Sequence, residues 1–287
     1  MGHAEDEITP FLKARRAALD AASLGLPDGL ARRRVRGLRR EEVARLAGVS
    51  VDYYTRIEQG RAHAVSDAVI DAIARALRLT PDEHAFLRNI SHGRRGAHTE
   101  VCDAGAGPRP RVRPQLLELL EAMGDTVPAV VYGPGTDLLA WNTIIGRIWF
   151  DLDALPEAEL NGARLMFLHP DAKALHPDWE AEAEETVASL RAQIGRREAE
   201  ARVQRVVCDL REQSEEFRHY WDVQAVRERT QGIKRILHPQ VGELVLTYEA
   251  FSLPTDPGQR LCTYTAPKGS PTAAKLRTLA EPATATA

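Results

Sequence analysis

The stretch 38–61 constrains the fold most, because its pattern predicts two short helices joined by a tight turn. The first helix is expected over residues 40–47, where apolar side chains recur on one face: Val43, Leu46 and Ala47. Gly48 follows, and a glycine past a helix end can take the left-handed conformation that other residues avoid. Ser50 can accept hydrogen bonds from the next backbone amides, so it predicts the start of a second helix, which ends at Gly60.

The spacing within this stretch matches a helix-turn-helix, in which the second helix enters the DNA major groove. Counted from Arg40, an alanine stands fifth and a glycine ninth, so that Ala44 lets the helices cross closely and Gly48 forms the corner. Apolar residues occupy the positions that hold the helix pair together: Val43, Ala47, Val49, Tyr54 and Ile57. The alternative is an ordinary helical hairpin, but the spacing, the caps and the local charge together favour a DNA-binding motif.

The same segment resembles the DNA-binding domain of XRE-type, lambda-repressor-like regulators. The end of the motif, residues 56–61 (RIEQGR), is typical of that group. More narrowly, residues 37–44 (GLRREEVA) and 51–54 (VDYY) resemble the MmyB-like regulators of actinobacteria. The resemblance implies an all-α, five-helix head that binds double-stranded DNA.

The outer face of the second helix carries the side chains expected to contact bases. Arg56 can pair with guanine through two hydrogen bonds, Val51 can touch a thymine methyl group, and Asp52 can accept from cytosine. Asp52 is equally well explained as an acid at the positive end of its helix. Arg40 stands at a helix N-terminus suited to a phosphate, whereas Glu58 is expected to hold the head together. The predicted DNA-binding residues are Arg39, Arg40, Ser50, Val51, Asp52, Tyr53, Thr55, Arg56, Gln59 and Arg61.

Charge is distributed unevenly along the 287 residues, whose net charge is −3. Residues 1–99 carry 17 basic and 13 acidic side chains, whereas residues 100–287 carry 21 and 28. A basic first part on an acidic remainder fits a DNA-binding head joined to a domain that does not bind DNA. Arginines concentrate just before and inside the motif, where they suit contact with phosphates or, alternatively, form a solvated face: Arg32, Arg33, Arg34, Arg36, Arg39, Arg40 and Arg45.

Composition and missing motifs argue against several other classes of protein. No apolar run approaches the roughly 20 residues of a membrane span, and the acidic N-terminus differs from a signal peptide. The three cysteines, Cys102, Cys208 and Cys262, are too far apart to indicate a disulfide framework or a zinc site. Nucleotide-binding, hydrolase and metalloprotease motifs are missing. We therefore expect a cytoplasmic, nucleoid-associated protein without cofactor or metal, and not an enzyme.

The pattern along the chain predicts two domains and a linker. Residues 1–92 form the head, with further helices expected over 7–22, 67–77 and 80–90. Residues 93–113 hold glycines and prolines with few apolar side chains, which predicts a linker that permits relative motion. Residues 114–270 form the second domain and residues 271–287 a C-terminal tail.

The second domain is predicted to be α+β. Two short apolar runs flank a turn at 133–135, several helical segments follow, and three more strands close the domain. Gly195 is expected to divide the long helical stretch 179–213 into two helices. This order predicts a five-stranded antiparallel sheet with helices on one face, a PAS-like arrangement. The domain resembles the ligand-binding domain of the MmyB-like regulators in several stretches: 139–142 (LAWN), 167–170 (FLHP), 177–179 (PDW), 214–218 (SEEFR), 238–248 and 257–261 (PGQRL).

The resemblance implies a small apolar, fatty-acid-like effector bound between the sheet and its helices. Such sites combine apolar walls with a few polar groups. Core packing explains most of the large aromatic residues equally well, and a helix cap explains His169. The candidate ligand-binding residues are Trp141, Asn142, Trp149, Phe167, His169, Trp179, Trp221, Gln224 and Tyr248.

Together these features predict a sequence-specific transcriptional regulator, and we expect a repressor. One such head is too small to specify a site alone, and the motif usually binds as a dimer to half-sites one helical turn apart. We therefore expect a homodimer on an inverted repeat, with the second domain supplying much of the dimer interface. The alternative is an adaptor whose second domain binds a protein partner; the arginine set and the open outer face argue against it.

Overall fold

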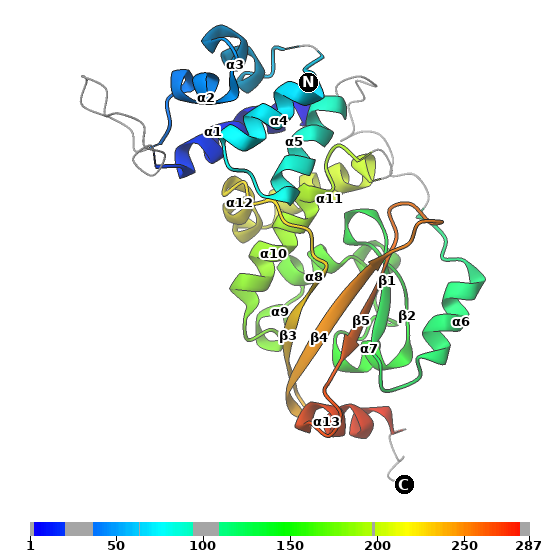
Figure 1. Cartoon of the computed structure of the whole chain (residues 1–287). Helices are drawn as coiled ribbons and strands as arrows, with labels where there is room; N and C mark the ends of the chain where they lie inside the picture. The colour runs from blue at the N-terminus through cyan, green and yellow to red at the C-terminus, as the bar shows by residue number, and fades with distance from the viewer. Residues whose placement is uncertain (1–2, 21–36, 63, 94–108, 197–198, 282–287) are drawn as a thin grey trace.

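The computed structural model describes residues 3–20, 37–62, 64–93, 109–196 and 199–281. A helical head stands at one end of the molecule, on a second domain built around a sheet (Figure 1). No helix within these ranges combines the length and apolarity needed to cross a membrane. The predicted linker lies mostly outside them, as do the arginines at 32–36.

The described part of the head contains five helices, as the sequence predicts. They are α1 (His3–Ala18), α2 (Arg40–Ala47), α3 (Val51–Glu58), α4 (Asp67–Ala76) and α5 (Pro81–Gly93). Gly48 ends α2 with a φ of 68°, and the Ser50 hydroxyl accepts a hydrogen bond from the Tyr53 amide at 3.1 Å. Thr80 and Glu83 cap the start of α5 reciprocally, each side chain accepting from the other's amide. The predicted helix-turn-helix and its caps are therefore confirmed.

The second domain is built on one antiparallel sheet of five strands. They are β1 (Ala129–Tyr132), β2 (Leu138–Trp141), β3 (Gln231–His238), β4 (Gly242–Ser252) and β5 (Arg260–Thr265), in the order β2-β1-β5-β4-β3. β1 pairs with β5, so that Val130 lies opposite Cys262 and the first hairpin meets the last strand. This arrangement confirms the predicted sheet.

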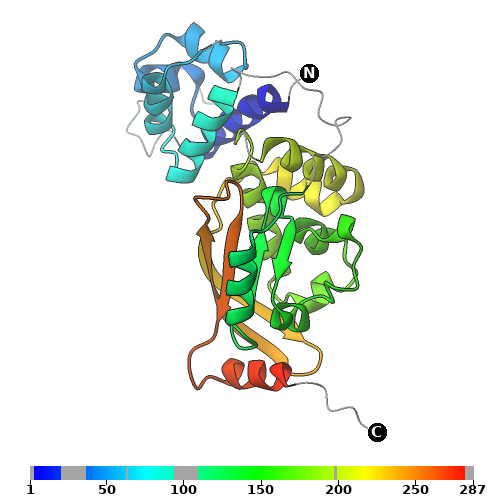
Figure 2. The same cartoon turned by 90° about the vertical axis from the view of Figure 1, so that its right-hand side faces the viewer.

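Helices cover both faces of the sheet, whereas the sequence analysis placed them on one face. Most of these helices lie on one face of the sheet or at the junction with the head. They are α7 (Thr143–Ile148), α8 (Gly162–Leu168), α9 (Ala172–Leu175), α10 (Trp179–Ala192), α11 (Glu200–Gln213) and α12 (Glu215–Asp222). The helix α6 (Pro114–Ala122) covers the other face (Figure 2). There Leu116 and Leu120 pack against Val131 and Leu261. Strand alternation supplies both faces, because Val131 and its neighbour Val130 point to opposite sides.

The expected C-terminal tail begins with a helix, α13 (Pro271–Ala280). The Ser270 hydroxyl accepts from the Ala273 amide at 3.1 Å, and Pro271 occupies the first turn. Leu276 and Leu279 are buried against the core of the second domain. The helix therefore closes the end of the sheet farthest from the head (Figure 1).

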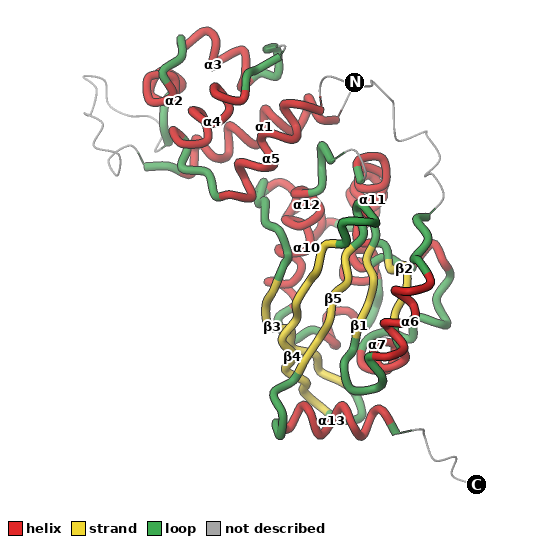
Figure 3. The backbone as a smooth tube through the Cα atoms, turned by 45° about the vertical axis from the view of Figure 1, so that its right-hand side comes forward, coloured by secondary structure: helices red, strands yellow, loops and turns green. Residues whose placement is uncertain are grey.

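One hydrophobic core runs from the head into the second domain. Buried residues of α1 and α5 join those of α10 and α11 in this core. Figure 3 shows α1 and α5 of the head next to the helical end of the second domain. Gly195, which ends the α10 segment, lies so close to α5 that an added Cβ would come within 2.8 Å of the Asn89 backbone. Its φ of +78° also favours glycine. The head is therefore packed against the second domain, rather than joined to it by a linker alone.

Candidate DNA interface and effector cavity

The outer face of α3 is exposed. Val51 is 47% exposed, and Asp52, Arg56 and Gln59 are exposed beside it. Ser50 and Arg61 flank this face and are exposed, whereas Tyr53 and Thr55 are half-buried. Figure 1 shows α3 on the side of the head that points away from the sheet. The predicted base-contacting residues thus share one accessible surface.

A fully buried carboxylate organises the base of this surface. Glu58, the last residue of α3, accepts from Arg16 Nε at 2.9 Å and pairs with Arg40 Nη2 at 2.7 Å. Burial by itself would raise the pKa of Glu58, but the two arginines hold it below its usual range. Because Arg16 comes from α1 and Arg40 begins α2, the carboxylate ties three helices together. This supports the structural role expected for Glu58.

Arg40 therefore both pairs with the buried Glu58 and remains accessible to a phosphate. Its guanidinium is held by Glu58, yet its side chain stays 39% exposed beside the α2 N-terminus. A phosphate placed there would meet an arginine whose orientation is already fixed. Arg39 is also half-exposed, and its guanidinium lies 3.4 Å from Glu41 in a solvent-facing pair.

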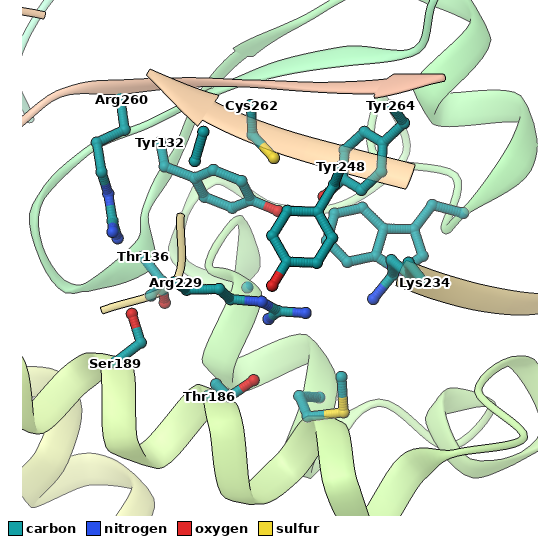
Figure 4. Close-up of a pocket in the computed structure, with 14 residues that line it drawn as sticks. Tyr132, Thr136, Thr186, Ser189, Arg229, Lys234, Tyr248, Arg260, Cys262 and Tyr264 are labelled. Atoms are coloured by element: carbon teal, nitrogen blue, oxygen red, sulfur yellow. The ribbon is translucent and has the colours of Figure 1, made fainter. Parts of the chain in front are cut away.

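A cavity of about 60 Å³ lies between the sheet and α10 in the second domain (Figure 4). The apolar part of its wall includes Trp149, Met166 and Ala250. The hydroxyls of Thr186 and Ser189 approach it from α10 (Figure 4). The cavity therefore has the mixed character of small-molecule sites, in which apolar walls surround a few polar groups.

Two arginines that line the cavity have long contacts with carboxylates, and Arg229 also interacts with the Tyr248 hydroxyl. Arg229 Nε lies 3.8 Å from Glu185, and Arg260 Nη1 lies 3.7 Å from Glu228. These separations exceed hydrogen-bond length. The described residues that line the cavity include Arg229 and Arg260 but no carboxylate. Burial lowers the pKa of Arg260 from its ordinary value, yet an arginine remains charged in proteins. The cavity therefore favours an anionic group.

Three tyrosines surround these cations: Tyr132, Tyr248 and Tyr264. Burial raises the pKa of each phenol, so that all three stay neutral near pH 7. The Arg229 guanidinium lies 5.2 Å from the centre of the Tyr248 ring, within cation–π range. The tyrosines thus offer flat apolar surface and hydroxyl groups to the same ligand.

A buried polar chain closes the opposite end of the cavity. Trp149 donates its indole N–H to His176 Nε2 at 3.1 Å, and His176 Nδ1 lies 3.5 Å from Glu182. Glu182 in turn binds the ammonium of Lys234, which lines the cavity. Burial and the nearby Lys234 lower the pKa of His176, so this histidine is neutral near pH 7. Lys234 is therefore neutralised by Glu182, unlike the two arginines.

Trp149 and Tyr248 are the predicted ligand-binding residues that line the cavity. Several of the others have structural partners elsewhere. Asn142 accepts from the Ala129 amide and donates to the carbonyls of Gly124 and Val127. Trp141 donates to Asp153, on the surface. These two residues fix the turn and loop beside β2.

The remaining predicted residues belong to an aromatic layer and to the junction with the head. The Phe167 ring contacts the Trp179 and Phe217 rings, with centroids 5.9 and 5.2 Å apart. The His169 ring is tilted by 50° to the Phe150 ring, with centroids 4.4 Å apart, and its Nδ1 accepts from the Asp171 amide. Residues 221 and 224 lie at the base of the head, where the Trp221 ring supports the guanidinium of Arg191 at 3.9 Å.

Sequence reasoning missed the cavity's cations, although one of them carried a signal. Along β3, alternate residues face the core, and Lys234 occupies an inward position two residues before the buried Ile236. A lysine at such a position predicts a buried partner or a ligand. Arg229 and Arg260 lie at a loop and a strand start, where the sequence alone does not show which way they face.

Comparison with known proteins assigns a family to each of the two domains. Residues 112–279 match the family model described as the MmyB-like transcription regulator ligand binding domain. Residues 11–87 match the model of a helix-turn-helix domain. No curated protein matches the chain. The chain is thus a DNA-binding transcription regulator with a ligand-binding domain, and both matched domains belong to regulators rather than to enzymes.

Proposed function

Because the chain belongs to the MmyB-like transcription regulators, we propose that it is a repressor on nucleoid DNA in the cytoplasm, controlled by a small effector in the cavity beneath the sheet. The cavity itself carries this proposal, because it joins apolar walls to two incompletely paired arginines. A fatty-acid-like molecule offers the matching chemistry, an apolar body and one acidic group.

The cavity also limits how such an effector binds. A volume of about 60 Å³ accommodates the acidic end and the first few carbons. A longer chain must displace part of the apolar wall near Trp149 and Met166. We therefore expect affinity to depend strongly on chain length, with the acidic group common to all ligands that bind.

On DNA, we propose that two copies bind an inverted repeat as a homodimer. The exposed face of a single α3 helix offers few base-contacting side chains, and helix-turn-helix dimers bind half-sites about one helical turn apart. The second domain is proposed to supply much of the dimer interface. The predicted DNA-binding residues, from Arg39 and Arg40 to Arg61, are proposed to contact the operator.

The test measures binding of full-length protein to its own upstream DNA by fluorescence anisotropy, across a salt series and with a set of fatty acids from octanoate to palmitate. We expect sequence-selective binding that weakens steeply with salt, since phosphate contacts release counterions. At least one acid should weaken selective binding tenfold or more. Selective binding that no acid alters would contradict the effector and favour a second domain that binds a protein partner.

A further inference from the structure

We infer that the loop between α12 and β3, residues 223–230, transmits occupancy of the cavity to the DNA-binding head, with Glu228 as the shared contact. We call this segment the coupling loop. The inference rests on the proposed function insofar as it requires an effector in the cavity. Beyond that function, it identifies the residues that convert effector binding into a change at the head.

The coupling loop contacts the head at two points. Arg15 of α1 donates from Nη2 to the Gln224 carbonyl at 2.9 Å. Asp82, in the first turn of α5, accepts from the Glu228 amide at 2.9 Å. Both contacts are polar and directional, so a small shift of the loop changes them. Gln224 also holds a φ of 61°, which indicates a loop conformation fixed by its surroundings.

The same loop reaches the cavity through adjacent residues. Arg229 lines the cavity directly, and the Glu228 carboxylate faces Arg260, a second lining residue, at 3.7 Å. Glu228 is also paired with Arg196, in the segment between α10 and α11. Its amide therefore contacts the head while its carboxylate contacts a cation of the cavity.

An anion in the cavity would compete with Glu228 for Arg260. At 3.7 Å the Arg260–Glu228 contact is longer than a hydrogen bond, whereas a ligand carboxylate can accept charge-assisted bonds of about 2.7–2.9 Å from a guanidinium. Arg229 would turn from Glu185 to the same ligand. Both changes loosen or move the coupling loop, and the loop in turn alters its contacts with Arg15 and Asp82.

Other contacts keep the head attached while the loop moves. Arg191, fully buried, binds Glu7 of α1 at 3.3 Å and donates to the Trp221 carbonyl at 2.7 Å. Gly195 packs against the backbone of Asn89. Neither contact involves a residue that lines the cavity. The coupling loop therefore adjusts the placement of the head rather than releasing it, and in a dimer this alters the distance between two recognition helices.

The first experiment uses hydrogen–deuterium exchange on the full chain, comparing wild type with Glu228→Gln and Arg260→Gln. Both variants should raise exchange several-fold in residues 223–230 and in the first turn of α5. The matched control is Cys262→Ala, which changes a lining residue on the same strand as Arg260 and should leave α5 unchanged. If both variants leave α5 exchange equal to wild type, the inference is overturned. Arg260→Lys keeps the charge, so comparing it with Arg260→Gln separates the loss of charge from misfolding of the glutamine variant.

The second experiment adds decanoate to the full chain and follows binding by intrinsic tryptophan fluorescence, to which Trp149 contributes from the cavity wall. Decanoate should raise α5 exchange in wild type and add little in Arg260→Gln. Binding without any change in α5 would overturn the coupling but leave the effector proposal intact. If decanoate does not bind, the effector proposal fails for this acid, while the Glu228→Gln and Arg260→Gln exchange patterns still decide whether loop and head are coupled.

Discussion

Glu58 in the head and Glu182 in the second domain are both buried carboxylates, but the cations that they pair with differ in exposure. In the head, Glu58 is fully buried but its partners Arg16 and Arg40 remain partly exposed, with side-chain exposures of 19% and 39%. In the second domain, both Glu182 and its partner Lys234 are buried, with side-chain exposures of 8% and 3%. Glu58 thus orients two cations that are partly open to solvent, whereas Glu182 neutralises a cation whose side chain is almost fully buried.

This difference predicts that the two carboxylates contribute unequally to the free energy of unfolding. Removing one member of a buried ion pair leaves an uncompensated charge, but a partly exposed cation can regain water. The largest effect is therefore expected in the second domain. There the loss of the Glu182 charge leaves the Lys234 ammonium unpaired next to the apolar wall of the cavity.

Glu182→Gln should lower the free energy of unfolding by about 3–5 kcal/mol, because Lys234 loses its buried partner. Urea unfolding followed by circular dichroism measures the change. Glu184→Gln is the matched control, since Glu184 is an exposed glutamate on the same helix. A loss no larger than that of the control would show that Lys234 is hydrated or neutral in the folded protein.

The pH dependence of stability tests the same pair without mutation. Burial alone would raise the pKa of Glu182, but Lys234 and His176 bring it down to about 2. Since its pKa is lower in the folded than in the unfolded chain, its stabilisation is present above about pH 4.5 and is lost as pH falls toward 2. The pKa difference corresponds to about 3 kcal/mol. We expect wild type to lose more unfolding free energy than Glu182→Gln over this range, in urea titrations at stepped pH.

Glu58→Gln should cost less, about 1.5–3 kcal/mol, the range for hydrogen bonds to charged groups. The two arginines keep part of their hydration, which limits the penalty. Urea unfolding gives the value, and it should be smaller than that of Glu182→Gln in the same buffer. The reverse order would contradict the distinction between an exposed and a buried cation. The substitution should also change DNA affinity, because Arg40 loses its fixed orientation.

The two regions also differ in how far the sequence predicts them. In the head, the turn at Gly48 and the caps at Ser50 and Thr80 follow from side chains a few positions apart, so local spacing suffices. Local patterns of apolar residues likewise predict the strands of the second domain. The cavity is not predicted by such patterns, because its residues come from distant segments. Tyr132 and Arg260 meet only when β1 pairs with β5, and Arg229 joins them from the loop before β3.

Two further features depend on tertiary packing in the same way. The break at Gly195 was predicted from its residue type, but its close approach to Asn89 follows from the docking of the head. The aromatic residues favoured as ligand contacts mostly pack on one another, since their size serves the core as well as a ligand. A pattern of residue types thus identifies elements, whereas a site assembled across elements needs the register of the sheet.

The smallest expected effect concerns the exposed face of α3, where a substitution should change recognition without changing stability. Arg56→Ala should weaken specific DNA binding by about 1–3 kcal/mol and leave the unfolding free energy within about 0.5 kcal/mol of wild type. The arginine is exposed in the last turn of α3, so its loss should leave the core unchanged.

Arg75→Ala is the control for Arg56→Ala, because Arg75 is an exposed arginine on α4. It separates base recognition by Arg56 from the general effect of removing one positive charge. Anisotropy titrations on the upstream DNA and on scrambled DNA supply the comparison. If Arg56 contacts a base, its loss reduces affinity for the operator more than for the scrambled sequence. Equal losses on both sequences would assign Arg56 to the phosphate backbone, and sequence preference would then have to come from its neighbours on α3, Val51 and Asp52.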